Sequence, residues 1–238
     1  MIIDTLKYTI SPYSITLIAS IIIGFAVAAI LLVRSKIDKM IIVFSVMINT
    51  TLLVYFGLIY TVISNAIYKS GGLGFSSMGG MMGVLLGSFI MYAVTKKTDI
   101  IKSYSAILPL VYSISKLGCF FVGCCGGKEY RGPLAVTYLG NMDFIMPYPT
   151  FPVPLLESVC FALIFIIVMV LYSKLSTSKH IALNVLICAA MKFGLDYLRI
   201  SHVGQILSMN QIACMITVIC MAVIMIIISR KKLIQRKV

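Results

Sequence analysis

The chain has 238 residues, of which 61% are hydrophobic and 11% are charged, and it contains no tryptophan. A soluble protein would need roughly 25% charged residues to cover its surface, so the composition excludes an ordinary soluble domain and indicates that lipid is the solvent. The net charge of +13 comes mainly from Lys and Arg residues beside apolar runs. Cations in that position are attracted to anionic membrane lipid, and they do not indicate nucleic-acid binding.

Apolar runs with the length of a membrane-spanning helix recur along the whole chain. We expect seven spans, near residues 12–33, 40–66, 73–95, 103–122, 153–173, 181–200 and 205–229. No linker or repeat divides the chain, which predicts an all-α integral membrane protein with a single transmembrane domain over residues 1–238. The N-terminal residues lack the cationic start and the cleavage site of a signal peptide, so we expect the first span to be retained.

The basic residues predict how the spans are oriented. Lys and Arg follow the first, third and fifth spans and fill the C-terminal tail, and these segments hold thirteen of the twenty. With seven spans all of them fall on one side of the membrane, which the positive-inside rule makes the cytoplasmic side. We therefore expect the N-terminus outside and the C-terminus in the cytoplasm. The long connection from Gly123 to Pro152 then lies outside, and its length is typical of a functional or partner-facing loop.

Charged residues also occur inside the expected spans. Lys192, Asp196 and Arg199 are spaced i, i+4 and i+7, which puts them on one face of the sixth helix. Because an unpaired charge at membrane depth costs several kcal/mol, this face predicts a polar cavity for an anionic group. The alternative is a Lys192–Asp196 pair with Arg199 extending to the interface. Lys116 on the fourth span and Glu157 on the fifth reach a similar depth, so we expect all five charges to meet in the extracytoplasmic half.

A stripe of small residues marks the third span. Gly79, Gly83 and Gly87 recur every four residues, with Gly80 beside them. Small residues at this spacing let another helix approach closely, so helix packing is the simplest interpretation and close approach of a lipid chain is the alternative. The preceding segment, residues 71–77, is glycine-rich enough to present backbone amides to a phosphate.

Three of the seven cysteines gather where the fourth span ends: Cys119, Cys124 and Cys125. The two histidines, His180 and His202, lie elsewhere in the sequence, so we expect no four-ligand zinc site, no metal and no cofactor. Two interpretations stay open, which are packing of small thiols near a tight turn and a thiol redox role. Adjacent cysteines form only a strained ring when bridged, so a disulfide to Cys119 or to another protein is the form that a redox role would take.

Five sets of motifs follow one another along the chain. They are Gly71-Gly72-Leu73-Gly74-Phe75 with Met78-Gly79-Gly80-Met81-Met82-Gly83, Lys116-Leu117-Gly118-Cys119-Phe120 through Gly123, Pro152-Val153-Pro154-Leu155-Leu156-Glu157, Lys192 with Asp196 and Arg199, and Ser208-Met209-Asn210-Gln211. In this order they resemble the motifs of the prolipoprotein diacylglyceryl transferases, which are seven-helix bacterial membrane enzymes whose active site opens to the outer leaflet. The family counterparts are a glycine-rich segment ending in His-Gly-Gly, Gly-Arg-x-Gly-Asn-Phe, Pro-Ser-Gln-Leu-Tyr-Glu, an Arg, Glu and Arg set, and a closing Ser-Met-Gly-Gln.

Several positions depart from the family pattern, which indicates a divergent member. Met78 stands at the family's His, Cys119 at its Asn, and Lys116 and Lys192 at two of its Arg residues, and the first span offers Leu17 or Ile18 where a Tyr is expected. Lysine keeps the positive charge, but it cannot bind phosphate bidentately as arginine does.

The resemblance implies transfer of diacylglyceryl from phosphatidylglycerol, or another anionic phospholipid, to the thiol of a lipobox Cys in a prolipoprotein signal peptide. Glycerol 1-phosphate is released. The implied catalytic residues are Lys116, Lys192, Arg199, Glu157 and Asp196, and the implied substrate-binding residues are Gly79, Gly80, Cys119, Gly123 and Gln211. The cations would stabilise the leaving phosphate, and a carboxylate would take the thiol proton.

Two other functions remain as alternatives. One is a non-catalytic phospholipid-binding or partner protein with the same fold, which the replacement of the family His and Tyr favours. The other is a membrane thiol oxidoreductase built on Cys119, Cys124 and Cys125.

Overall fold

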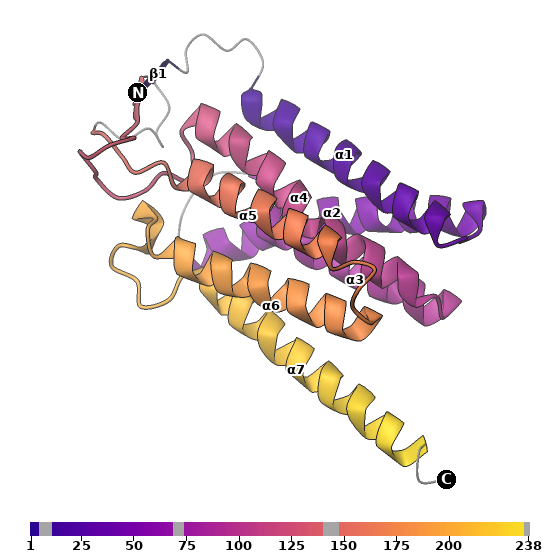
Figure 1. The fold of residues 1–238 in the computed structure, drawn as a ribbon. Coiled ribbons are helices and arrows are strands. Elements are labelled where there is room, and N and C mark those ends of the chain that lie inside the picture. The colour runs from indigo at the N-terminus through magenta and orange to yellow at the C-terminus, as the bar shows by residue number, and fades with distance from the viewer. Residues whose placement is uncertain (5–10, 69–73, 140–147, 236–238) are drawn as a thin grey trace.

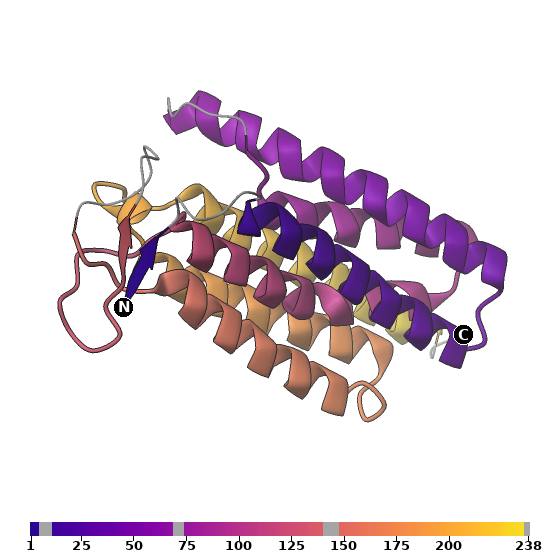
Figure 2. The same ribbon diagram turned by 90° about the horizontal axis from the view of Figure 1, so that it is seen from above.

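Long α-helices make up nearly all of the computed structural model, which describes residues 1–4, 11–68, 74–139 and 148–235. In that part of the chain there are seven: α1 (Pro12–Arg34), α2 (Lys39–Tyr68), α3 (Ser77–Thr95), α4 (Thr98–Val122), α5 (Val153–Val170), α6 (Thr177–Asp196) and α7 (Met209–Gln235). They run roughly along one direction (Figure 1, Figure 2). Two short strands, β1 (Ile2–Asp4) and β2 (Thr137–Leu139), and a 3-10 turn at Ile200–His202 complete the regular structure. The expectation of an all-α protein with about seven helices is confirmed.

Five of the helices are long and apolar enough to cross a membrane: α1, α2 as far as Ile67, α3, α4 and α5. In α7 the described apolar segment is shorter, Met209–Val223, and α6 carries charged residues along its length. Large apolar side chains cover the outside of the bundle, as Ile18, Val94 and Leu163 illustrate. An apolar exterior around buried charges is the reverse of a soluble protein, and it fits a bundle that faces lipid.

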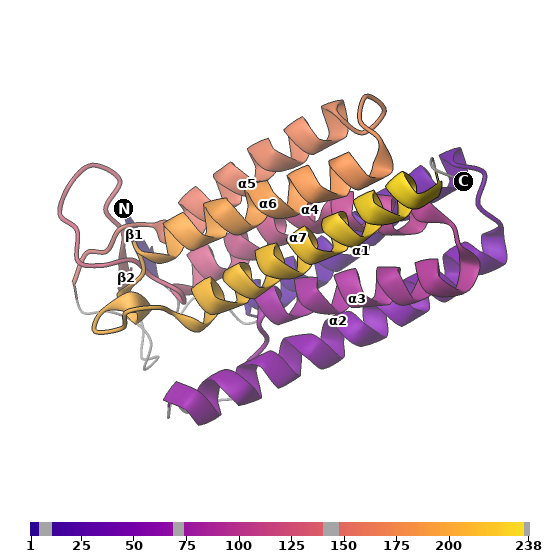
Figure 3. The same ribbon diagram turned by 90° about the horizontal axis from the view of Figure 1, so that it is seen from below.

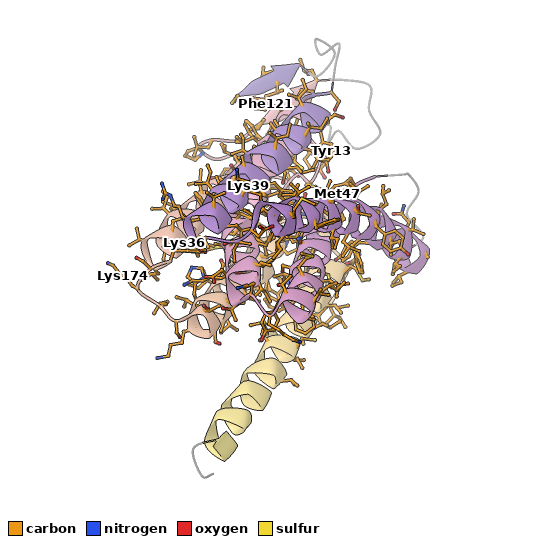
Figure 4. All side chains as sticks on the ribbon, turned by 90° about the vertical axis from the view of Figure 1, so that its right-hand side faces the viewer. Tyr13, Lys36, Lys39, Met47, Phe121 and Lys174 are labelled. Carbon is orange, nitrogen blue, oxygen red and sulfur yellow. The ribbon has the colours of Figure 1, made fainter. Side chains whose placement is uncertain are left out.

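The connections between helices divide between the two ends of the bundle. Those joining α1 to α2, α3 to α4 and α5 to α6 lie at one end, whereas β1 and the long segment after α4 lie at the other (Figure 1). Figure 4 looks onto the first of these ends and labels Lys36 and Lys39 near the α1–α2 connection and Lys174 between α5 and α6. The basic connections therefore gather at one end. Residues 236–238 of the basic tail lie outside the described part.

α4 is the central helix, since it packs against α1, α3, α5 and α6. It is also the most buried of the five long apolar helices. Phe25 of α1 packs on Tyr104 of α4 in the main apolar core, with ring centroids 5.6 Å apart. The Tyr104 hydroxyl shares a hydrogen bond of 3.0 Å with Ser45 of α2, which satisfies both groups in the interior. This central position carries the next turns of α4, including Lys116, into the middle of the protein.

The glycine stripe of α3 brings its backbone against that of α2. A Cβ atom on Gly83 would lie 2.2 Å from the carbonyl oxygen of Leu52, and one on Gly79 would lie 2.3 Å from that of Phe56. No side chain fits at such a contact, so these positions need glycine for close helix approach. The packing interpretation of the stripe is therefore confirmed.

A small parallel sheet closes one end of the bundle. β1 pairs with β2, with Ile3 opposite Tyr138, and both side chains pack with Phe120 of α4. Figure 3 shows the two strands beside the ends of α4, α5 and α6. The sheet holds the segment after α4 over the end of the bundle where the buried charges lie.

Candidate functional site

Glu157 lies at the centre of a buried network of charges. It occupies the first turns of α5 and is fully buried. Its Oε1 accepts hydrogen bonds from Lys192 Nζ at 2.7 Å and from the Tyr112 hydroxyl at 3.2 Å. Its Oε2 accepts one from Arg199 Nη2 at 2.6 Å and lies 3.7 Å from Lys116 Nζ. One carboxylate therefore joins α4, α5, α6 and the segment after α6.

Asp196, the last residue of α6, is the second carboxylate of the network. Its Oδ1 lies 3.0 Å from Lys192 Nζ and 3.5 Å from Arg199 Nε, and it accepts a hydrogen bond from Asn210 Nδ2 at 3.1 Å. The Ser208 hydroxyl donates to Oδ2. The structure thus brings together all five charged residues that the sequence analysis singled out. Three cations face two carboxylates, so the described network has one positive charge in excess.

Arg199 reaches this network from outside the helix. The sequence analysis expected a sixth span near residues 181–200, with Arg199 seven residues after Lys192 on the same helix face. That expectation is wrong for Arg199, because α6 ends at Asp196. The backbone after α6 pairs instead with the segment after α4, because Ile200 N–H donates to Gly126 O at 3.2 Å and Lys128 N–H donates to Leu198 O at 3.1 Å. Arg199 is 6% exposed, which rules out the alternative in which it extends to the interface. Its Nε has no hydrogen-bond partner in the described part of the chain.

The three cations line one cavity of about 560 Å³. The remaining lining is mainly hydroxyl, amide and sulfur groups: Ser11, Tyr13, Tyr60, Thr61, Ser64, Asn65, Ser76, Ser77, Met78, Tyr112, Cys119, Cys124, Cys125 and Asn210. Two smaller, largely apolar cavities of about 20 and 50 Å³ share part of this lining, the first at Phe75 and the second at Met78. A cavity that combines charged groups with apolar surface, beside two apolar cavities, suits an amphipathic molecule.

The glycines and Cys119 of the expected substrate-binding set occupy different surroundings. Cys119 lines the large cavity, and Gly80 lines the smallest one. Gly79 faces α2, as described above. Gly123 ends α4 with φ +82°, where a Cβ atom would lie 2.9 Å from the Tyr138 ring. Of the glycine-rich segment 71–77, residues 71–73 lie outside the described part, and Ser76 caps α3 by accepting a 3.3 Å hydrogen bond from Gly79 N–H.

Gln211 is buried in the first turn of α7, where it forms a capping box with Ser208. Ser208 Oγ accepts from Gln211 N–H at 3.2 Å, and Gln211 Oε1 accepts from Ser208 N–H at 3.0 Å. The Gln211 amide also donates to Phe193 O at 3.2 Å, and its Oε1 lies 2.9 Å from His202 Nε2. Gln211 thereby fixes Ser208 against Asp196 instead of lining the large cavity.

The sequence analysis named none of the three tyrosines in the cavity wall, of which Tyr13 and Tyr112 lie beside positions that it did name. Tyr13, in the first turn of α1, donates from its hydroxyl to Phe75 O at 2.8 Å. Tyr13 lies one helical turn before Leu17, and Leu17 is one of the two positions where the family resemblance leads us to expect a Tyr. Tyr112 lies one turn before Lys116, whose Nζ is 5.0 Å from the centroid of its ring. Each tyrosine lies four residues before a position that the sequence analysis named. Residues four apart share a helix face, so this spacing could have indicated that Tyr13 and Tyr112 face the site.

The three clustered cysteines meet on the same cavity wall. Their Sγ atoms lie within 4.8 Å of one another, and all three are free thiols. Lys116 Nζ lies 4.0 Å from Cys119 Sγ, within reach of a weak hydrogen bond. Side-chain hydrogen bonds with Cys119 and Cys124, followed by the charges of Lys116 and Arg199, hold the pKa of the Cys125 thiol well below its usual value. The cluster therefore adjoins the charged network through Lys116.

Two comparisons with known proteins lead to the same family description. A protein-family model described as prolipoprotein diacylglyceryl transferase matches residues 1–227. A relative from Clostridium tetani (strain Massachusetts / E88), named phosphatidylglycerol-prolipoprotein diacylglyceryl transferase, is 31% identical over 78 residues, which make up 32% of this chain and 31% of the relative. The match thus spans about a third of that relative's length, whereas the family model includes every residue that lines the cavity. On the strength of that coverage, the chain belongs to the prolipoprotein diacylglyceryl transferase family.

Proposed function

We propose that this chain transfers the diacylglyceryl group of phosphatidylglycerol to the thiol of a lipobox Cys in a prolipoprotein. Family membership supports the reaction class. The observation that carries the proposal is the network of three cations and two carboxylates beside a cavity of about 560 Å³. Its excess positive charge, and the Nε of Arg199 that donates no hydrogen bond to a described residue, suit the single negative charge of a phosphodiester.

The charged residues take distinct parts in this mechanism. The acceptor thiol gives up its proton to solvent, and its sulfur attacks the glyceryl carbon that bears the phosphate. A C–S bond forms, the C–O bond breaks, and glycerol 1-phosphate leaves with the electron pair. Lys116, Lys192 and Arg199 stabilise the charge that develops on the leaving group. Lys116 is the most loosely held, because its nearest carboxylate oxygen is 3.7 Å away. Glu157 and Asp196 are engaged with cations, so they position those cations.

The direct test is a lipidation assay with purified chain in phosphatidylglycerol vesicles and a lipobox peptide, read by mass spectrometry. Wild-type protein should add one diacylglyceryl group to the peptide thiol. Lys116→Met should slow the transfer on the order of 100-fold, because it removes one preorganised cation from the leaving phosphate. Lys36→Met, at the opposite end of the bundle, is the matched control and should keep the wild-type rate. Absence of any lipidated peptide with wild-type protein would overturn the proposal.

We also propose that the cavity opens on the extracytoplasmic side of a bacterial plasma membrane, with the N-terminus outside and the C-terminus inside. The lysines of the α1–α2 and α5–α6 connections support this, because they gather at one end of the bundle and cytoplasmic connections are the basic ones. A membrane-impermeant maleimide applied to intact spheroplasts should label Glu129→Cys above the wild-type background, but not Lys36→Cys. The opposite labelling pattern would reverse the orientation.

A second candidate function is lipid binding without transfer. It is favoured by Met78, which lines the cavity where the family resemblance expects a His, and among the described residues no histidine lines that cavity. This function predicts saturable binding of phosphatidylglycerol and no lipidated peptide. Met78→His restores the family's general base, so we expect this variant to gain diacylglyceryl transfer that the wild-type chain lacks.

A further inference from the structure

The cluster of Cys119, Cys124 and Cys125 has no part in the transfer mechanism above. Cys119 lies in the last turn of α4, and the chain then reverses at Gly123, with φ +82°, and at Cys125, with φ +60°. A positive φ is uncommon outside glycine, so at Cys125 it marks backbone that its surroundings hold in place. The turn thus brings two thiols back over a third, all within 4.8 Å.

Three thiols at this spacing are close to the geometry of a thiolate metal site. Zinc–sulfur bonds of about 2.3 Å in a tetrahedron place the sulfur atoms about 3.8 Å apart. The sulfur atoms of the cluster lie within 4.8 Å of one another, so side-chain movements that shift each of them by about 1 Å would close the site. The sequence analysis argued against zinc because a fourth protein ligand is missing. A site with three protein ligands and one open position removes that objection, and it is the arrangement found in catalytic zinc sites.

The surroundings favour thiolates at this position. Lys116 Nζ lies 4.0 Å from Cys119 Sγ, and Arg199 lines the same cavity. Three thiolates alone would concentrate three negative charges beside these cations, whereas a divalent ion leaves only one. Cys119 is buried, while Cys124 and Cys125 are more accessible, so an ion held between them would border the cavity and not the apolar core.

We propose that Cys119, Cys124 and Cys125 hold a thiophilic divalent ion of the zinc type, and that its open position takes the thiol of the acceptor cysteine. This proposal rests on the transferase function proposed above. A thiol bound to such an ion is deprotonated. The site would therefore supply the acceptor thiolate, which neither Met78 nor the ion-paired carboxylates provide.

The step balances without a redox change. The acceptor thiol loses its proton to solvent as its sulfur binds the ion. That sulfur then forms the C–S bond to the glyceryl carbon while the C–O bond breaks, and the electron pair stays on the phosphate oxygen. The ion keeps its charge throughout, and Lys116, between the cysteines and Glu157, lies within reach of both the thiolates and the leaving phosphate.

The first experiment measures metal binding by the full-length chain, purified in detergent, reduced with a phosphine and stripped of metal. Addition of Co²⁺ should produce a thiolate-to-cobalt charge-transfer absorption that saturates at a single equivalent and disappears when Zn²⁺ is added. The double variant Cys124→Ser/Cys125→Ser should lose this absorption. The matched control, Cys160→Ser/Cys220→Ser, replaces two cysteines outside the cluster and should keep it. Thermal unfolding of both variants checks that they are folded.

The second experiment adds a lipobox peptide to the cobalt-loaded protein. The charge-transfer absorption should strengthen, because a fourth thiolate binds the ion, and a peptide with Ser in place of Cys should leave it unchanged. Failure of the Cys peptide to alter the spectrum would overturn the activating role.

The outcomes separate this proposal from the transferase function. If the chain lipidates the peptide but binds no metal, the metal site is refuted and the transferase stands. If it binds cobalt and the peptide thiol but never lipidates, the transferase is refuted and the site stands. Retention of cobalt binding by Cys124→Ser/Cys125→Ser, or a disulfide within the cluster that re-forms in preference to metal binding, would also overturn the proposal.

Discussion

Replacing Glu157 with Gln should destabilise the protein far more than the loss of an ordinary ion pair. Glu157 is fully buried, and three cations lie 2.6 to 3.7 Å from its oxygens. The amide keeps the shape but removes the charge, so the three cations would face Asp196 alone. Removing one partner of a buried ion pair costs about 3–5 kcal/mol, because the remaining charge is left uncompensated. We expect the upper part of this range, which lowers the unfolding midpoint by on the order of 10 °C.

Thermal unfolding of the purified chain in detergent, followed with a dye that reacts with newly exposed cysteines, measures this effect. Glu129→Gln is the matched control, because it makes the same change in a surface pair with Arg131 whose side chains are 50% and 79% exposed. Its cost should not exceed about 1 kcal/mol. Glu157→Gln combined with Lys116→Met should recover part of the loss, because Glu157 is the carboxylate that pairs with Lys116. Equal midpoints for Glu157→Gln and wild type would refute the buried network.

Three further substitutions test the parts that position the site. Gly83→Ala puts a Cβ atom 2.2 Å from Leu52 O, so it should lower the free energy of unfolding by about 1–3 kcal/mol in a thermal unfolding assay. Gly194→Ala is the control, because no atom lies within 4 Å of its added Cβ, and it should leave the stability unchanged. Gly123→Ala places a Cβ atom at φ +82° and 2.9 Å from the Tyr138 ring, so it should lower the free energy of unfolding by about 1–2 kcal/mol. It should also abolish the cobalt absorption, and cobalt binding equal to that of the wild type would contradict the role of this turn. Ser208→Ala removes the acceptor for Gln211 N–H at the start of α7 and a donor to Asp196, so it should lower stability by about 1–3 kcal/mol in thermal unfolding. An unchanged midpoint would refute the role of Ser208 as the α7 cap.

The convergence of the five charges could be predicted because an apolar chain offers charged side chains so few partners. Lys116, Glu157 and Lys192 had to meet near one depth or remain unpaired in lipid. The position of Arg199 could not be predicted in the same way. Its helix ends early because the backbone after α6 pairs with the segment after α4, and a contact between such distant segments leaves no periodic trace in the sequence.

The tyrosines and cysteines were harder to interpret for a different reason. A tyrosine within an apolar run, such as Tyr112, has the same local pattern as a core residue, and only its contact with Glu157 distinguishes it. The Cys119 cluster depends on a turn with two positive φ values, one of them at Cys125, where the residue type gives no indication of that conformation. In the same way, the pairing of β1 with β2 joins residues more than a hundred positions apart.

The carboxylate at Glu157 also has a consequence for how the chain enters the membrane. Lys116 belongs to α4, whereas both carboxylates of the network belong to later helices, Glu157 on α5 and Asp196 on α6. A nascent chain inserted only as far as α4 therefore holds an ammonium group in the apolar layer with no network carboxylate yet available, at a cost of several kcal/mol. Arrival of α5 removes that penalty. The network itself is complete only once α6 and the segment after it have followed, because they supply Lys192, Asp196 and Arg199.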